Sequence, residues 1–84
     1  METKTITKTY KIGPKADLEG ADLGGANLEG ANLEGAELGN AYLQRANLEG
    51  ANLRGADFAD AFIDDARMSG AIIDDGKGQD YVLV

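Results

Sequence analysis

Carboxylates are the side chains through which this sequence could do chemistry. Its 84 residues hold 15 Asp and Glu against 8 Lys and Arg. Two adjacent pairs, Asp64-Asp65 and Asp74-Asp75, carry the oxygen ligands that Ca²⁺ and Mg²⁺ prefer. No cage motif surrounds either pair, and acid–base catalysis needs a pocket that shifts a carboxyl pKa. The sequence therefore predicts no catalytic residue, no metal ligand and no cofactor.

The missing residue types exclude other classes of protein. With no Cys and no His, the chain cannot build a disulfide framework, a zinc finger or a His-based triad. Gly76-Lys77-Gly78 lacks the upstream spacing and the Ser or Thr of a phosphate-binding loop. No apolar segment resembles a signal peptide or a membrane span. We therefore expect a protein of the cytoplasm, or of a particle assembled inside the cell.

The elements that would position these side chains come from an internal repeat. Residues 16–75 are twelve pentapeptides without a gap, and Ala takes the first place in all of them. The third place, called the centre below, is apolar throughout: Leu18, Leu23, Leu28, Leu33, Leu38, Leu43, Leu48, Leu53, Phe58, Ile63, Met68 and Ile73. A period of five places centres on one face of neither an α-helix nor a strand. The chain must therefore turn a corner every five residues.

The fifth place supports such corners. It is Gly in seven repeats, and Asn40, Asp60, Asp65 or Asp75 in four more. These residue types tolerate the positive φ that tight turns require. Arg45 is the exception, and we expect strain or a different turn type there.

This run resembles the pentapeptide-repeat family, whose signature is A-(D/N)-L-x-x. The resemblance implies an all-β fold, a right-handed quadrilateral parallel β-helix in which four pentapeptides make one coil. It further implies about three coils, over residues 16–35, 36–55 and 56–75. Residues twenty apart would then stack in columns.

The outer columns carry two features. One is an acidic strip formed by Asp17, Glu19, Glu37, Asp57 and Asp60. The other is a column in which Tyr42 and Phe62 stack on the outside, with Ile72 also on the outside of the coil. Adjacent exposed aromatic rings indicate a patch that something covers. Either the chain's own tail or a partner could cover it.

The two ends differ from the repeats. Residues 1–15 alternate with period two, which predicts a strand-forming arm with Ile6, Tyr10 and Ile12 on one side. This arm has a charge of +3, against −10 for residues 16–75. The tail, residues 76–84, contains an apolar run with Tyr81 and Leu83. It could cap the last coil or dock on another subunit.

The favoured function is a non-enzymatic structural or interaction module, held in a homo-oligomer or a larger assembly. Strand addition by the arm would supply the backbone contacts. A decoration or cement protein of a particle such as a virus shell would suit the size. The candidate partner-binding residues come from the arm, the outer aromatic patch and the tail: Ile6, Tyr10, Ile12, Tyr42, Phe62, Ile72, Tyr81 and Leu83.

The family resemblance also implies an alternative, a DNA mimic that inhibits or protects a type II topoisomerase. Length argues against it, because three stacked coils at ~4.8 Å each span about 14 Å. One turn of DNA is about 34 Å long. A net charge of −7 also argues against direct binding of nucleic acid, since phosphates would be repelled.

Overall fold

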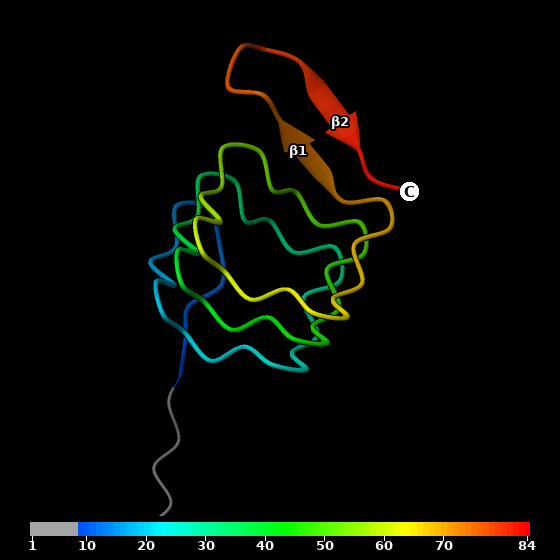
Figure 1. The fold of residues 1–84 in the computed structure, drawn as a ribbon. Coiled ribbons are helices and arrows are strands. Elements are labelled where there is room, and N and C mark those ends of the chain that lie inside the picture. The colour runs from blue at the N-terminus through cyan, green and yellow to red at the C-terminus, as the bar shows by residue number, and fades with distance from the viewer. Residues whose placement is uncertain (1–8) are drawn as a thin grey trace, which may run out of the picture.

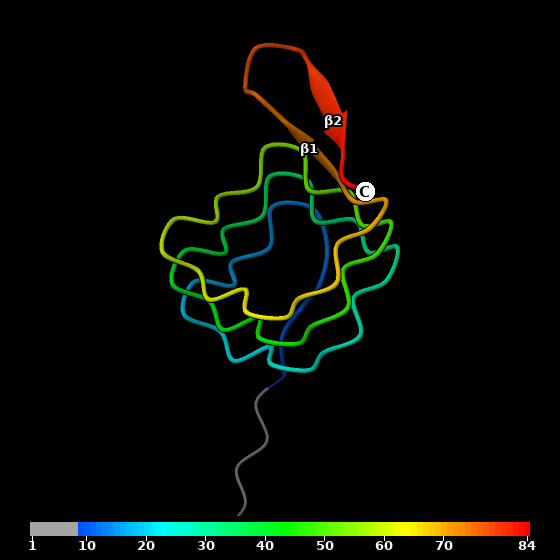
Figure 2. The same cartoon turned by 45° about the vertical axis from the view of Figure 1, so that its right-hand side comes forward.

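Residues 9–84 form a stack of squared turns followed by a β-hairpin, as Figure 1 and Figure 2 show for the computed structural model. The chain turns a corner at the fifth place of the repeat, where the seven glycines have φ between 67° and 79°. At each corner, the next Ala N–H donates to the preceding centre carbonyl, as from Ala21 to Leu18 at 3.0 Å. A turn with positive φ at its third residue suits Gly, which has no Cβ to clash.

Arg45 makes the same corner as its neighbours. Its φ is 59°, matching Asn40 at 57° and Asp60 at 59°, and the Ala46 N–H donates to the Leu43 carbonyl at 3.0 Å. The expectation of a different turn type is therefore wrong. Stacking imposes the common geometry, because the Arg45 N–H must donate to the Asp64 carbonyl at 2.9 Å. A left-handed conformation at a residue of this kind costs about 1–2 kcal/mol.

The corners begin earlier than the repeat pattern indicates. Lys15 has a φ of 60°, and the Ala16 N–H donates to the Gly13 carbonyl at 3.1 Å. The Lys15 N–H also donates to the Glu34 carbonyl at 2.7 Å, as a fifth-place residue does elsewhere. The end of the segment assigned to the arm is thus a corner of the stack. The sequence pattern did not indicate this pentapeptide, because Gly13 stands at the centre position, where the other repeats have a larger apolar residue.

Parallel bridges join residues twenty apart, as the resemblance implied. They form these columns: Asp17–Glu37–Asp57, Asp22–Tyr42–Phe62, Asn27–Asn47–Arg67 and Asn32–Asn52–Ile72. Between neighbouring turns the bonds follow one rule. The centre N–H donates forward to a second-place carbonyl, as from Leu38 to Asp57 at 2.8 Å. The second-place N–H donates back to an Ala carbonyl, as from Glu37 to Ala16 at 2.9 Å.

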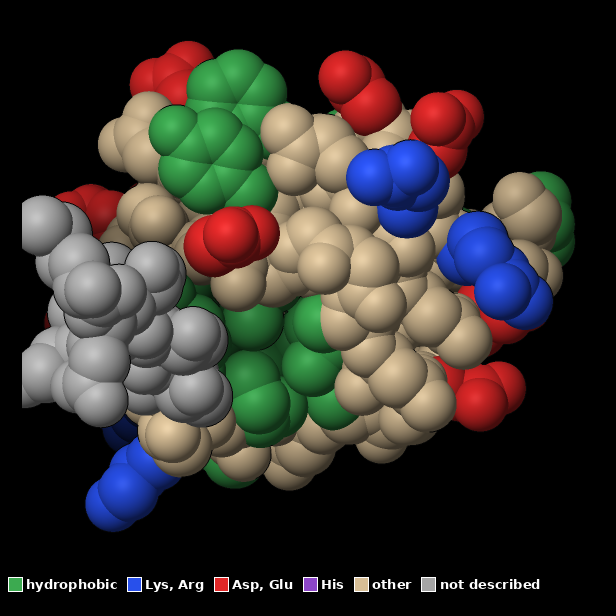
Figure 3. All heavy atoms as spheres, turned by 90° about the horizontal axis from the view of Figure 1, so that it is seen from below, with side chains coloured by type: hydrophobic (Ala, Val, Ile, Leu, Met, Phe, Trp, Pro, Cys, Tyr) green, Lys and Arg blue, Asp and Glu red, His purple; other side chains and the backbone are tan. Residues whose placement is uncertain are grey.

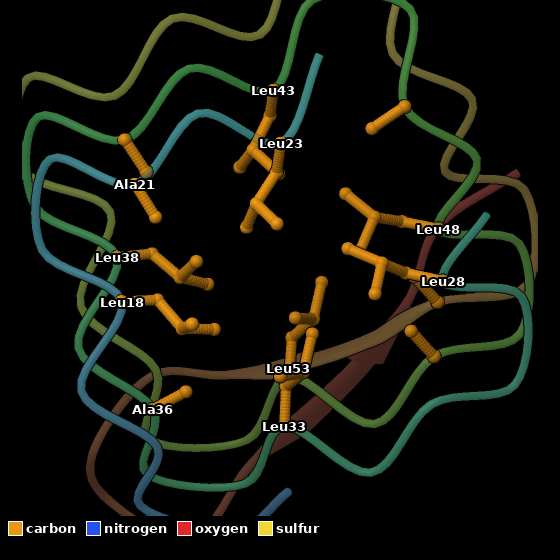
Figure 4. Close-up of a cluster of buried hydrophobic side chains, with 14 residues drawn as sticks. Leu18, Ala21, Leu23, Leu28, Leu33, Ala36, Leu38, Leu43, Leu48 and Leu53 are labelled. Atoms are coloured by element: carbon orange, nitrogen blue, oxygen red, sulfur yellow. The ribbon is translucent and has the colours of Figure 1, made fainter. Parts of the chain in front are cut away.

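The centres fill the interior of the stack. Figure 4 shows the labelled leucines pointing toward one another from all sides. Leu38, Leu43 and Leu48 are fully buried, and the small first-place alanines beside them allow close backbone packing. Packing loosens over residues 56–75, where Phe58, Met68 and Ile73 are only partly buried. Ile63 is 48% exposed there.

The tail folds back on the chain as a hairpin. Strand β1 (Ile72–Asp74) pairs antiparallel with β2 (Asp80–Val82), with Ile72 opposite Val82. The Gly70 N–H donates to the Leu83 carbonyl at 2.6 Å, and the Leu83 N–H donates to the Ala71 carbonyl at 2.9 Å. These two bonds occupy positions that a further coil would fill, so the tail caps one side of the chain's own stack.

The described part of the arm, residues 9–15, contains no strand. The predicted strand is wrong for these residues, because no neighbouring strand supplies a ladder and a side chain holds the segment instead. Tyr10 packs against the core, and its hydroxyl oxygen accepts the Asp22 N–H at 3.3 Å. Residues 1–8, including Ile6, lie outside the described part. Over residues 9–84 there is no helix that could cross a bilayer.

Candidate interaction surface

Second-place Asp and Asn side chains have a structural task on the outer wall. Their Oδ1 atoms accept the backbone N–H two residues later, as Asn47 accepts from Glu49 at 3.0 Å. The same bond is made by the side chains of Asp17, Asp22, Asn27, Asn32, Asn52 and Asp57. These local bonds hold the turn, and they match the supporting role expected of the Asn columns. The Asn32 and Asn52 side chains also meet directly, at 3.4 Å.

Within residues 16–71, four second-place residues make no such bond: Glu37, Tyr42, Phe62 and Arg67. Arg67 has another structural use, because its Nη2 donates to Glu49 Oε1 at 2.8 Å. Tyr42 and Phe62 cannot hold the turn with their side chains. The turn bond is given up at two stacked positions in favour of aromatic rings.

The Tyr42 and Phe62 rings lie face to face on the outer wall. Their centroids are 5.0 Å apart and their planes differ by 5°. The two residues are 43% and 46% exposed, so neither the tail nor another described segment buries them. Stacking satisfies one face of each ring and leaves the edges in water. The pair is a flat, pre-ordered apolar surface of the kind that protein interfaces use.

The acidic strip lies on the neighbouring wall, and its five residues are all exposed. Bridges place Asp17, Glu37 and Asp57 in one column. Asp17 and Asp57 hold their own turns through Oδ1, at 3.3 Å and 2.9 Å. Glu37 makes no side-chain hydrogen bond within residues 9–84. The turn geometry therefore accounts for two of the three stacked carboxylates and leaves Glu37 without a structural role.

The candidate partner-binding residues fall into separate places. Tyr42 and Phe62 form the outer pair, and Tyr10 and Ile12 lie before the first corner, where Ile12 is 41% exposed. Ile72 is half-buried in β1, where the tail covers it through the pairing with Val82.

The tail itself is divided between two environments. Leu83 is half-buried against the core, so it serves the chain's own fold. Tyr81 and Val82, by contrast, are 51% and 61% exposed. The tail thus covers Ile72 but leaves the Tyr42–Phe62 pair open.

Ile63 is an exposed apolar residue that the sequence analysis missed. Its centre position predicted burial, yet it is 48% exposed, next to Phe62 at 46%. It lies in the last pentapeptide turns, where no further coil of the described residues covers the centres. Its position in the end coil could therefore have indicated its exposure. Figure 3 shows apolar side chains gathered in two places on one face, one of them hollowed.

The carboxylate pair at the hairpin has hydrogen-bonding roles within the fold. Asp74 Oδ1 accepts the Gly55 N–H at 3.1 Å, in place of a ladder carbonyl. Asp75 Oδ1 accepts the N–H groups of Lys77 at 2.7 Å and Gln79 at 3.2 Å, which closes the hairpin loop. Among residues 9–84, no three acidic side chains gather closely enough to hold a metal ion.

Comparisons with known proteins agree with this geometry. The family model described as pentapeptide repeats (8 copies) matches residues 15–50 and 36–75. One similar solved structure is the pentapeptide repeat protein Rfr23 from the cyanobacterium Cyanothece 51142. It is 38% identical with a TM-score of 0.53, over 75% of this chain and 43% of that one. The chain matches no curated protein sequence.

A second similar structure is HetL, a pentapeptide repeat protein involved in heterocyst differentiation regulation in the cyanobacterium Nostoc sp. strain PCC 7120. It is 40% identical with a TM-score of 0.55, over 76% of this chain and 32% of that one. The chain thus spans less than half the length of either structure. Such proteins are non-enzymatic repeat proteins that fold as right-handed quadrilateral β-helices. With its corners, its columns and this match, the chain belongs to the pentapeptide-repeat family.

Proposed function

We propose that this chain is a protein–protein interaction module that self-associates, either as a homo-oligomer or within a larger assembly. The observation that carries the proposal is the exposed Tyr42–Phe62 stack, with centroids 5.0 Å apart. Each ring replaces an Asp or Asn that would have held a turn. A protein that gives up two turn bonds for water-exposed aromatic surface has a use for that surface.

The charge distribution supports an assembly built from this chain. Residues 16–35 and 56–75 each have a net charge of −5, whereas residues 36–55 are neutral. Residues 1–15 have a charge of +3. A basic segment beside an acidic body favours contact between copies through opposite charges. The acidic ends repel each other, which opposes their stacking directly on one another. A decoration or cement role on a larger particle is one form that such an assembly could take.

The test is the native mass of the protein, measured by light scattering across a concentration series. Tyr42→Asn with Phe62→Asn replaces both rings by the residue that holds the turn in the neighbouring columns. The double variant should fold, because Asn restores the local bond, and it should associate at least tenfold more weakly. Asp22→Asn, in the same column, is the matched control and should behave as the parent does. A parent that is monomeric at every concentration would end the proposal.

DNA mimicry is the second candidate, and one observation favours it. Asp17, Glu37 and Asp57 stack in one exposed column, and Glu37 has no role in the turn. We expect this short column to leave a type II topoisomerase active at tens of micromolar protein. Submicromolar inhibition of supercoiling that Glu37→Gln relieves would instead favour the mimic.

A further inference from the structure

The two ends of the β-helix differ in how far their apolar centres are buried. At the end nearest the arm, the centres Leu18, Leu23 and Leu28 are 1%, 7% and 6% exposed. At the opposite end, Phe58 and Met68 are partly exposed and Ile63 is 48% exposed. The centres at the first end are buried, whereas the second end presents apolar centres to water. We call the segment Ala61–Ile63, at the second end, the open rim.

The open rim also lacks ladder partners for its backbone. Elsewhere a centre N–H donates to the next turn, as Leu43 does to the Phe62 carbonyl at 2.8 Å. At this end of the stack, the Leu83 backbone pairs only with the Gly70 N–H and the Ala71 carbonyl. Within residues 9–84, the Ile63 N–H has no acceptor and the Ala61 carbonyl has no donor. Sheet edges of this kind accept an added strand.

A second β-helix end is the wrong occupant for this rim. Both terminal coils have a net charge of −5, so stacked ends would repel each other. The β2 strand and Leu83 already lie where a complete coil would have to stack, on the side of Ile72. The occupant should therefore be a single extended segment with positive charge.

The N-terminal segment of this chain has that chemistry. Residues 3–8 read Thr-Lys-Thr-Ile-Thr-Lys, with β-branched residues at four of six positions and two lysines. In an extended segment Lys4, Ile6 and Lys8 share one side. The rim offers a matching order, because apolar Ile63 lies between Asp60 on one side and Asp64 and Asp65 on the other.

We infer that residues 3–8 of one copy add as a β-strand to the open rim of a second copy. One residue of the incoming strand accepts the Ile63 N–H and donates to the Ala61 carbonyl. Ile6 covers Ile63, and the two lysines meet the flanking aspartates. The incoming strand also extends the Tyr42–Phe62 column by one layer. This inference rests on the proposed self-association and names the surfaces that carry it.

The resulting contact joins different surfaces of the two copies, so it is heterologous. A heterologous contact repeats from copy to copy and gives closed rings or open chains. It also makes a specific prediction about mixtures. A copy with a defective segment keeps its rim, and a copy with a defective rim keeps its segment.

The experiment uses two full-length variants, Ile6→Asp for the segment and Ile63→Asp for the rim. Each alone should be monomeric by light scattering. An equimolar mixture should form a dimer with one copy of each, because one intact segment meets one intact rim. Val84→Asp, which changes an exposed apolar residue outside both the segment and the rim, is the control and should assemble as the parent does. Thermal unfolding of each variant establishes that it folds.

A second pair of variants covers the case in which Ile63→Asp does not fold. Lys4→Glu with Lys8→Glu alters no residue of the β-helix, and it should weaken assembly at least tenfold at low salt. High salt should weaken assembly of the parent in the same direction. If the parent assembles and neither Ile6→Asp nor the Lys4/Lys8 variant changes its mass, the strand-addition inference is wrong while self-association stands. If the parent never assembles, the proposed function fails first.

Discussion

The Leu83 amide donates to the Ala71 carbonyl at 2.9 Å, in the position that the next coil of a longer β-helix would occupy. The same residue accepts the Gly70 N–H at 2.6 Å, and its side chain packs against the core. The tail is therefore a partial replacement for a missing coil.

Truncation of the Leu83 side chain in the tail should destabilise the protein measurably. Leu83→Ala removes a half-buried side chain, and we expect a loss of about 1–2 kcal/mol in the free energy of unfolding by urea. Asp80→Ala breaks the pair between Arg54 Nε and Asp80 Oδ2 at 3.0 Å. Because that pair is exposed to water, its loss should cost less than about 1 kcal/mol. Equal effects of the two substitutions would contradict this assignment.

Two adjacent glycines should respond to alanine in opposite directions. Gly25 has a φ of 70°, where a Cβ is strained, so Gly25→Ala should cost about 1–2 kcal/mol. Gly24 has no positive φ, and an added Cβ would only contact Asp22 Oδ1 and the Gln44 carbonyl at 3.6 Å. Gly24→Ala should therefore be neutral or stabilise by up to about 1 kcal/mol. Thermal unfolding of both variants checks the difference in sign.

Arg45→Gly should stabilise the fold. It relieves a left-handed conformation at φ 59°, and the Arg45 side chain makes no hydrogen bond within residues 9–84 that would be lost. The expected gain is up to about 1 kcal/mol, because the more flexible unfolded chain offsets part of the relief. Gln44→Gly, one residue earlier and without a positive φ, serves as the control and should destabilise. A loss of stability in Arg45→Gly would mean that its side chain has a role in packing.

The core should be energetically uneven along its length. Leu43 is fully buried, so Leu43→Ala should cost about 2–5 kcal/mol. Ile63 is in the next turn of the same inner column but 48% exposed, and Ile63→Ala should cost less than half as much. Urea unfolding at low protein concentration keeps self-association from masking the difference. Similar losses would show that Ile63 is covered in solution.

The repeat made the β-helix predictable because each place in the pentapeptide has one structural role and nearly always holds the same class of residue. Ala at the first place, an apolar centre and a turn former at the fifth place together specify the corner and the core. Columns twenty residues apart followed from the family resemblance and are confirmed by the bridges. The stacking of Tyr42 on Phe62 was predicted in the same way and is confirmed at 5.0 Å.

The departures from prediction lie where the repeat stops. Lys15 forms a corner although Gly13 stands at its centre place, because the ladder bond to Glu34 holds the backbone in that conformation. Ile63 is exposed although its pattern is that of a core residue, because burial depends on a next coil and residues 9–84 form none above it. Residues 9–12 alternate as a strand does, yet they form none, because alternation supplies no pairing partner. Tertiary contacts decide each of these cases.

The twenty-residue register also determines how such a chain can change length in evolution. A gain or loss of five residues between positions 42 and 57 would leave every centre facing inward. It would nevertheless turn the downstream surface by one wall, which would move Phe62 off Tyr42 and Asp57 off Glu37. Only a change of twenty residues preserves both the interior and the surface. Small duplications can therefore reshuffle the outer face of this fold while its stability survives.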